Sequence, residues 1–182
     1  MIRAIGLVEI RSISKGMAVA DEMLKASEVE LLQAGSVCPG KYVVLIGGDL
    51  SAINASVDRA KGMAKEVLID SFVIGRVDES LFPAIYGSTE IKEKKALGII
   101  ETFTAASIIE GADAAVKAAD VQLIEIRVAR GMGGKCFATL TGNVSDVVAA
   151  VEHGSKKAKE EGVLINTEVI ANPHPDLWDQ VL

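Results

Sequence analysis

The chain has two cysteines, whose thiols could bind a metal or act as nucleophiles. Cys38 opens the run Cys38-Pro39-Gly40-Lys41, and Cys136 follows a second Gly-Lys pair much later in the chain. Two cysteines so far apart form neither a C-x-x-C ligand pair nor a disulfide framework. A metal site on Cys38 would therefore need ligands from other chains. Cys136 begins an apolar strand, so we interpret it as structural.

The other polar candidates do not form a recognisable catalytic set. The segment Gly131-Met132-Gly133-Gly134-Lys135 superficially suggests a phosphate-binding loop. It lacks the full spacing of that motif, and we expect a strand rather than a helix to follow it. His153 and His174 do not pair with a serine and a carboxylate in any triad arrangement. We therefore expect that the protein is not an enzyme.

The chain repeats itself. The run from Ala4 to Glu9 returns from Ala96 to Glu101, an offset of 92 residues. The repeat continues in both helices and strands, with Asp21, Lys25 and Ala26 matching Asp113, Lys117 and Ala118, and Gly40-Lys41 matching Gly134-Lys135. Two copies of one fold are therefore expected on one chain. Because Glu9 and Glu101 recur by duplication, we interpret them as structural.

Each copy is predicted to have the element order β-α-β-β-α-β of the ferredoxin-like α+β fold, with an antiparallel sheet and two helices on one face. We assign a first module to 1–88, a linker to 89–95 and a second module to 96–182. The expected strands are 2–11, 29–37, 41–46 and 67–74, then 96–102, 121–129, 135–141 and 163–170. The expected helices are 15–26, a segment from Asp49 to about Glu66, 104–118 and a segment after Asn143, with a short terminal helix in each half.

Composition limits the classes of partner. The net charge of −6 argues against a basic surface for nucleic acid or an anionic membrane. No apolar run approaches the roughly 20 residues of a membrane span, and the start Met1-Ile2-Arg3 has no signal-peptide pattern. We expect a cytoplasmic protein with reduced thiols that binds neither nucleic acid nor membrane.

These motifs together resemble the shell proteins of bacterial microcompartments, in particular the tandem class. The resemblance rests on the repeated Ala-x-Gly-x-x-Glu start, on Asp-x-x-x-Lys-Ala at 21–26 and 113–118, and on Gly-Lys followed by an apolar strand at 40–49 and 134–143. It implies two unpermuted shell modules and a homotrimer that looks like a hexamer, because six modules need only three chains. It also implies other shell proteins as partners in a microcompartment shell.

The resemblance assigns roles to two groups of residues. Lys25, Lys117 and Arg76 would lie at the edge of the tile and contact neighbouring tiles. Arg76 has Asn172 as its counterpart in the second half. The loops before each Gly-Lys would line a central pore, with Ser36, Val37, Cys38, Pro39 and Gly40 from the first half and Gly131, Met132, Gly133 and Gly134 from the second.

On a threefold axis three copies of Cys38 would converge, and thiolates of this kind suit an iron–sulfur cluster. Similar tandem shell proteins of the propanediol-utilisation type carry such a cluster in this loop. The resemblance thus implies one 4Fe-4S cluster per trimer, held by three Cys38 ligands. Its role would be electron transfer across the shell, with a lumenal or cytosolic redox enzyme as partner, or cluster repair.

Several alternatives stay open at this point. Three thiolates and a water also suit zinc, and a lone cysteine can be a small buried hydrophobe or a bystander thiol. The protein could then be a metal-free gated pore for metabolites in the shell. A soluble regulatory trimer that binds a metabolite between subunits is an alternative from another class.

Overall fold

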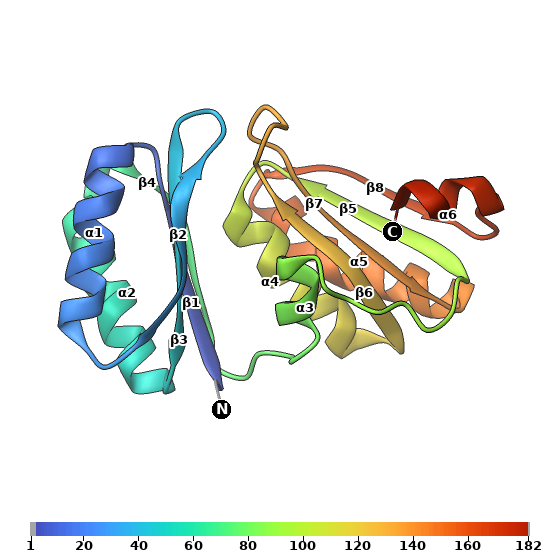
Figure 1. Ribbon diagram of the computed structural model, residues 1–182, viewed down its shortest axis with the longest axis horizontal. Coiled ribbons are helices and arrows are strands. Elements are labelled where there is room, and N and C mark those ends of the chain that lie inside the picture. Colours follow the sequence, from blue (N-terminus) through green and yellow to red (C-terminus); the bar gives the residue numbers. More distant parts are fainter. Residues whose placement is uncertain (1–2, 182) are drawn as a thin grey trace. The chain divides into compact units, whose positions relative to one another are not determined.

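A computed structural model describes residues 3–181 of the chain. Its first half is one antiparallel sheet with two helices (Figure 1). Its elements are β1 (Ala4–Ile10), α1 (Ile13–Ala26), β2 (Glu30–Val37), β3 (Lys41–Gly48), α2 (Leu50–Ala64), a single 3-10 turn (Lys65–Val67) and β4 (Leu68–Ile74). The predicted start of the first strand, Ile2, lies outside the described residues, as does Leu182 at the end of the predicted second module.

The second half repeats this order. Its elements are β5 (Ala96–Thr102), α4 (Ala105–Ala118), β6 (Val121–Val128), β7 (Cys136–Gly142), α5 (Val144–Glu160) and β8 (Leu164–Ile170). A short helix follows each repeat, α3 (Leu81–Tyr86) after the first and α6 (Pro175–Val181) after the second. The predicted β-α-β-β-α-β order is confirmed in both halves.

Both sheets have the same strand order. The first is β2-β3-β1-β4 and the second is β6-β7-β5-β8, and every pair of neighbours is antiparallel. The register repeats as well, because Glu9 lies opposite Asp70 in the first sheet and Glu101 lies opposite Asn166 in the second. This is the ferredoxin-like α+β arrangement that the sequence predicts.

The contacts of the chain divide it into two compact units. The first unit runs to Val77 and also contains two short segments of the second half, Thr104–Ala106 and Ala129–Gly134. The second unit contains Asp78–Phe103, Ser107–Val128 and the chain from Lys135 on. Module boundaries at residues 88 and 96 stay a prediction.

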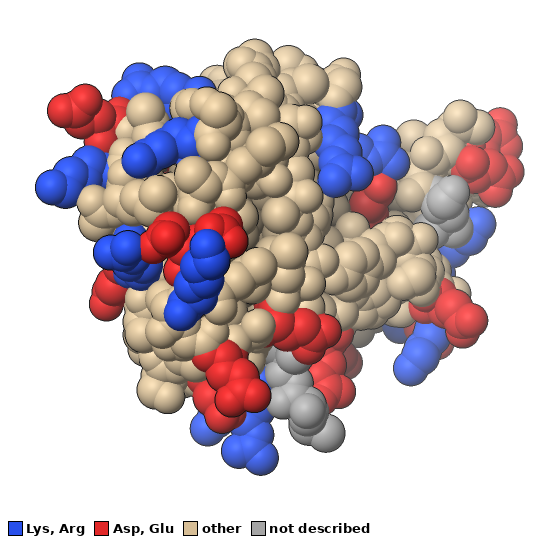
Figure 2. Space-filling model, turned by 60° about the vertical axis from the view of Figure 1, so that its left-hand side comes forward, with Lys and Arg blue, Asp and Glu red and all other residues tan. Residues whose placement is uncertain are grey.

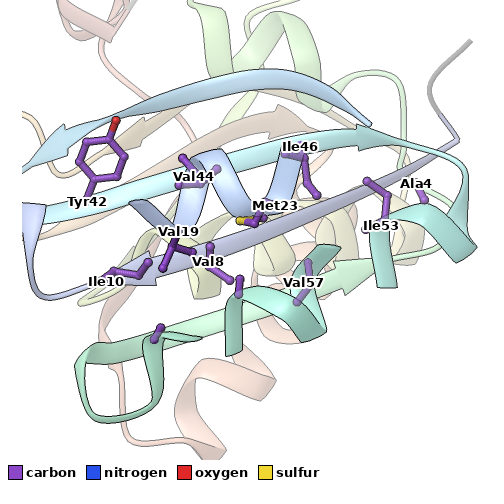
Figure 3. Packing of buried hydrophobic residues seen from close by; sticks show 13 residues of the cluster. Ala4, Val8, Ile10, Val19, Met23, Tyr42, Val44, Ile46, Ile53 and Val57 are labelled. Carbon is purple, nitrogen blue, oxygen red and sulfur yellow. The ribbon is translucent and has the colours of Figure 1, made fainter. Parts of the chain in front are cut away.

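The core of the first unit lies between its sheet and its two helices (Figure 3). Alternate residues of β1 and β3, such as Val8 and Val44, face Val19 of α1 and Val57 of α2. Strands place alternate side chains on one face, so both helices cover the same face of the sheet, as predicted. Aliphatic residues fill most of this layer, together with Met23 and Tyr42.

The glycine of the repeated Ala-x-Gly motif lies where a helix packs closely on the sheet. A Cβ on Gly6 would lie 2.7 Å from methyl carbons of both Ile53 and Val57 in α2. In the second half a Cβ on Gly98 would lie 2.8 Å from methyl carbons of Val147 and Val151 in α5. Any larger side chain would push the helix off the sheet, which explains why this glycine occurs in both copies.

Candidate functional site

Cys38 lies in the turn that joins β2 to β3. The turn is closed by a hydrogen bond from the Gly40 N–H to the Val37 carbonyl at 3.0 Å. Gly40 has φ +92°, a conformation that glycine adopts without steric cost. The Cys38 thiol is free and partly exposed, and Pro39 beside it is exposed. The Cys-Pro-Gly run therefore presents a single thiol at the end of a hairpin.

The loop that precedes β7 lies against this turn within the first unit. The Cys38 N–H donates to the Ala129 carbonyl at 2.7 Å. A Cβ on Gly134 would lie 2.9 Å from Cδ of Pro39. Gly131 and Gly133 are exposed and Met132 is partly exposed. The two loops predicted to line one pore are thus in direct contact, although the pore itself stays a prediction. As predicted, a strand and not a helix follows Lys135.

A buried ion pair lies behind the Cys38 turn. The Glu9 carboxylate on β1 is fully buried, and its Oε1 lies 2.5 Å from Nζ of Lys41, the first residue of β3. Its Oε2 accepts hydrogen bonds from the backbone N–H groups of Ala105 at 2.7 Å and Ala106 at 3.4 Å. These N–H groups begin α4, and the N-terminus of a helix favours negative charge. Sequence reasoning assigned Glu9 a structural role but not these partners.

A second carboxylate of the same sheet holds the same segment. Asp70 Oδ2 on β4 accepts a hydrogen bond from the Thr104 hydroxyl at 2.7 Å. Asp70 lies opposite Glu9 in the strand pairing. The segment Thr104–Ala106 is therefore held by two neighbouring acidic side chains of the first sheet.

The counterpart in the second unit has a different environment. Glu101 Oε1 lies 4.0 Å from Nζ of Lys135, and the Glu101 side chain is one-third exposed. Among residues 3–181, no backbone N–H donates to this carboxylate. The counterpart of Asp70 is Asn166.

The predicted tile-edge residues lie on the surface. Lys25 is in the last turn of α1 and pairs with Asp21, and Lys117 is in the last turn of α4 and pairs with Asp113. The hydrogen bond that the Lys25 ammonium donates to Asp21 is the main cause of its raised pKa. Arg76 is exposed just after β4. Their role at an edge stays a prediction.

The remaining candidates are placed as the sequence suggests. Cys136 is completely buried at the start of β7. The His153 ring contacts the carbonyl of Ala149 in its own helix, and His174 Nδ1 accepts from the Asp176 N–H. Within residues 3–181 of a single chain, no three histidine, cysteine or acidic side chains gather as a metal site. The prediction stays that a metal site on Cys38 would take its other protein ligands from further copies of the chain.

The surface shows no single basic patch on the face in Figure 2, where Lys and Arg lie next to Asp and Glu. Ion pairs join α1 to itself and to α2, namely Lys25 with Asp21 and Arg59 with Glu22. None of the helices within residues 3–181 is both long enough and apolar enough to cross a bilayer.

With the fold and loops described, comparison with known proteins identifies the class. The BMC domain model matches the chain twice, at residues 4–77 and 96–173. The chain therefore belongs to the BMC-domain family of bacterial microcompartment shell proteins. The family membership and the tandem arrangement implied by the resemblance are both confirmed.

Individual relatives agree with this assignment. Bacterial microcompartment shell protein PduT of Citrobacter freundii is 41% identical over 182 residues, which is 100% of this chain and 99% of that protein. The crystal structure of a microcompartment protein from Desulfitobacterium hafniense DCB has a TM-score of 0.88 and 47% identity, covering 98% of this chain and 99% of that chain. Shell protein EutM of Escherichia coli K12 is 41% identical over 83 residues, 46% of this chain and 84% of its own length.

Proposed function

We propose that this shell protein forms a homotrimeric tile whose central pore holds one 4Fe-4S cluster on three copies of Cys38. The observation that carries the proposal is the placement of a free, partly exposed thiol at the end of the β2–β3 hairpin, in contact with the second loop predicted to line the pore. As a structural tile, the protein would associate with other shell proteins. The relatives named above are shell proteins and not enzymes.

The number of modules supports the proposed trimer. One half of this chain corresponds to most of a single-module shell protein, EutM, and this chain carries two such modules. A closed ring of six modules then requires three copies. Each copy supplies one Cys38 turn, so a threefold axis through the hairpin ends would bring three thiols together.

The residues at the turn fit a cluster of this kind. Cys38 has no disulfide partner and its side chain is not fully buried, so a thiolate is available as a ligand. The loop beside it, Gly131-Met132-Gly133-Gly134, is glycine-rich and carries no acidic side chain.

When bound, the cluster would supply one-electron redox chemistry at the shell. The chain itself would orient the thiols through the closed Val37–Gly40 turn and hold the second loop against it. Electron transfer to a redox enzyme on one side of the shell is the role that we favour, and delivery of a replacement cluster is the other role consistent with three protein ligands.

A metal-free gated pore is the alternative, in which the same loops admit metabolites without redox chemistry. It differs from the cluster proposal in one measurable respect, because it assigns no role to the Cys38 thiol. A zinc site on the three thiols is a variant that metal analysis would distinguish.

The test is an anaerobic purification of the wild-type protein, Cys38→Ser and Cys136→Ser, followed by iron and sulfide counts per trimer and by absorption and electron paramagnetic resonance spectra. Cys136→Ser is the matched control, because it removes the buried thiol. We expect iron and sulfide in the wild type and in Cys136→Ser, and neither in Cys38→Ser.

Iron and sulfide that persist in full in Cys38→Ser would overturn the assignment of the ligand. A wild-type trimer free of both, after strict exclusion of oxygen and reconstitution with iron and sulfide, would leave the metal-free pore as the function. Zinc at one per trimer that is lost in Cys38→Ser would replace the cluster with a zinc site.

A further inference from the structure

The first sheet holds a helix start from the second half of the sequence. Within the first unit, Glu9 accepts from the N–H groups of Ala105 and Ala106, and Asp70 accepts from the hydroxyl of Thr104. The three residues Thr104–Ala106 are thus held by a side chain on β1 and one on β4. The Glu9 carboxylate satisfies helix N–H groups that have no partner within the helix.

The repeat supplies a second copy of both sides of this contact. Glu101 and Asn166 are the counterparts of Glu9 and Asp70, and they face each other across β5 and β8 as the first pair does across β1 and β4. The counterpart of Thr104–Ala106, at the offset of 92 residues, is Ser12–Ser14 at the start of α1. Ser12 is the N-cap of α1, and its hydroxyl accepts from Lys15.

Among the described residues of the second unit, the counterparts of Glu9 and Lys41 are more exposed than Glu9 and Lys41 themselves. The Glu101 side chain is one-third exposed, whereas Glu9 is completely buried. The Lys135 side chain, which is the counterpart of Lys41, is half exposed where that of Lys41 is 11% exposed. On the second sheet, the two side chains that would accept these hydrogen bonds, Glu101 and Asn166, are therefore accessible.

The starts of helices α4 and α1 differ in exposure in the same way. Ala105 and Ile109 on α4 are buried, at 0% and 2% exposure. Their counterparts on α1, Ile13 and Met17, are 38% and 56% exposed. Exposed apolar side chains next to an open helix N-terminus are typical of a surface that another protein surface covers.

We propose that Glu101 and Asn166 bind the start of α1, Ser12–Ser14, of a second copy of this chain. Glu101 would accept from the N–H groups of Ile13 and Ser14, and Asn166 would accept from the hydroxyl of Ser12. Closure would bury Ile13 and Met17 and bring Lys135 closer to Glu101. Each copy has one open acceptor side and one open helix start, so the contact is head-to-tail and closes into a ring.

This inference rests on the proposed homotrimer and assigns the contact that closes it. A ring of six modules would have six such contacts. Three of them would be formed within the chains, by Glu9 and Asp70 with Thr104–Ala106. The other three would be formed between chains by Glu101 and Asn166. The two kinds of contact differ in strength, because Asn166 is neutral where Asp70 is charged, and hydrogen bonds to charged groups are the stronger ones.

The test is sedimentation velocity over a dilution series for the wild type, Glu101→Gln, Asn166→Ala and Asn166→Asp, with Glu160→Gln as control. Glu160 is the last residue of α5 and is exposed, so it is a surface glutamate on a helix rather than on β5 or β8. Removal of a charged hydrogen bond weakens binding by about 10- to 100-fold. We expect Glu101→Gln to shift the dissociation midpoint by about tenfold or more, and Asn166→Ala, which removes a neutral hydrogen bond, to shift it by about two- to tenfold. Asn166→Asp should keep or strengthen the trimer, and Glu160→Gln should match the wild type.

The outcomes separate the two proposals. A wild-type protein that stays monomeric at every concentration would overturn the trimer itself, and with it this contact. A stable wild-type trimer that Glu101→Gln and Asn166→Ala weaken no more than Glu160→Gln would leave the trimer standing and overturn this contact alone. Circular dichroism of each variant establishes that the modules are folded. If Asn166→Ala dissociates the trimer and Asn166→Asp keeps it intact, the result would support a hydrogen bond to Ser12 rather than a loss of packing.

Discussion

Gly134 lies so close to Pro39 that a Cβ on the glycine would be 2.9 Å from Cδ of the proline. Gly134 also has φ +92°, which L-residues with a side chain rarely adopt. The second loop therefore reaches the Cys38 turn only because its last residue has no side chain. This contact, together with the hydrogen bond from Cys38 to Ala129, fixes the turn that presents the thiol.

Gly134→Ala should destabilise the first unit and displace the Cys38 turn. The new methyl group would meet Pro39, and the backbone would be strained, at a combined cost of about 2–3 kcal/mol. The matched control is Gly133→Ala, which shares the positive φ of +61° but has no atom within 4 Å of its Cβ. Its expected cost is about 1 kcal/mol.

Urea unfolding monitored by circular dichroism gives both free energies, and the reaction rate of Cys38 with a thiol reagent reports the position of the turn. The rate should change in Gly134→Ala and stay close to the wild type in Gly133→Ala. Equal effects of the two substitutions on both measurements would mean that the contact with Pro39 does not hold the turn.

The buried Glu9 carboxylate should contribute more to stability than any exposed glutamate of the same sheet. Glu9→Ala removes the acceptor for Ala105 and the charge that pairs with Lys41. Loss of one partner from such a buried pair costs about 3–5 kcal/mol. Glu30→Ala, on the exposed side of β2, should change the free energy of unfolding by less than about 0.5 kcal/mol. Similar losses for the two variants in urea unfolding would show that Glu9 is not a structural anchor.

The fold was predictable from local patterns that the repeat shows twice. Alternating apolar residues predicted the strands, and the β-α-β-β-α-β order of each half predicted an antiparallel sheet with two helices, all of which the structure has. The partners of Glu9 were not predictable from the residues near it. They come from Lys41 on another strand and from Ala105, 96 residues away in sequence, and no local spacing encodes such a contact.

The contact between the two loops was likewise not predictable from local sequence. The sequence predicted that the Cys38 turn and the Gly131–Gly134 loop would serve one site, from the family resemblance. The hydrogen bond between Cys38 and Ala129 that joins them depends on the placement of two hairpins. A meeting of three thiols depends on the assembly of three copies, because each chain supplies one Cys38.

The pKa of the Lys25 ammonium should fall when its partner on α1 is removed. The hydrogen bond and then the charge of Asp21 raise this pKa above its usual value, and Glu22 contributes least. A raised lysine pKa means that the pairing is present below the usual lysine pKa and is lost as the pH rises through the folded-state value. Lys25 therefore stays charged at neutral pH in every variant.

Asp21→Asn should lower the pKa of Lys25 toward that of a free lysine, and Glu22→Gln should lower it less. NMR titration of the Lys25 side chain in the two variants measures both shifts. A larger fall in Glu22→Gln than in Asp21→Asn would contradict the assigned cause. Because Lys25 is exposed, screening should leave the stability of the fold unchanged within error in both variants.

Substitution of the predicted edge residues should prevent tiling without dissociating the trimer. Lys25 and Lys117 occupy the same position in the two repeats, at the ends of α1 and α4, and Arg76 follows β4 on the surface. Exposed cations of this kind can reach carbonyl or carboxylate groups of a neighbouring tile. Electron microscopy of concentrated protein should show ordered sheets for the wild type, and none for Lys25→Ala with Lys117→Ala or for Arg76→Ala.

Lys156→Ala is the matched control, since Lys156 is an exposed lysine within helix α5. It should tile as the wild type does. Sedimentation velocity should give the same trimer for all of these variants, because the contact proposed to close the ring involves Glu101, Asn166 and the start of α1 and none of the edge residues. Sheets that persist in the Lys25 and Lys117 double variant would show that the tile edge is built from other side chains. Loss of the trimer in that variant would instead place the two lysines in the contacts that close the ring.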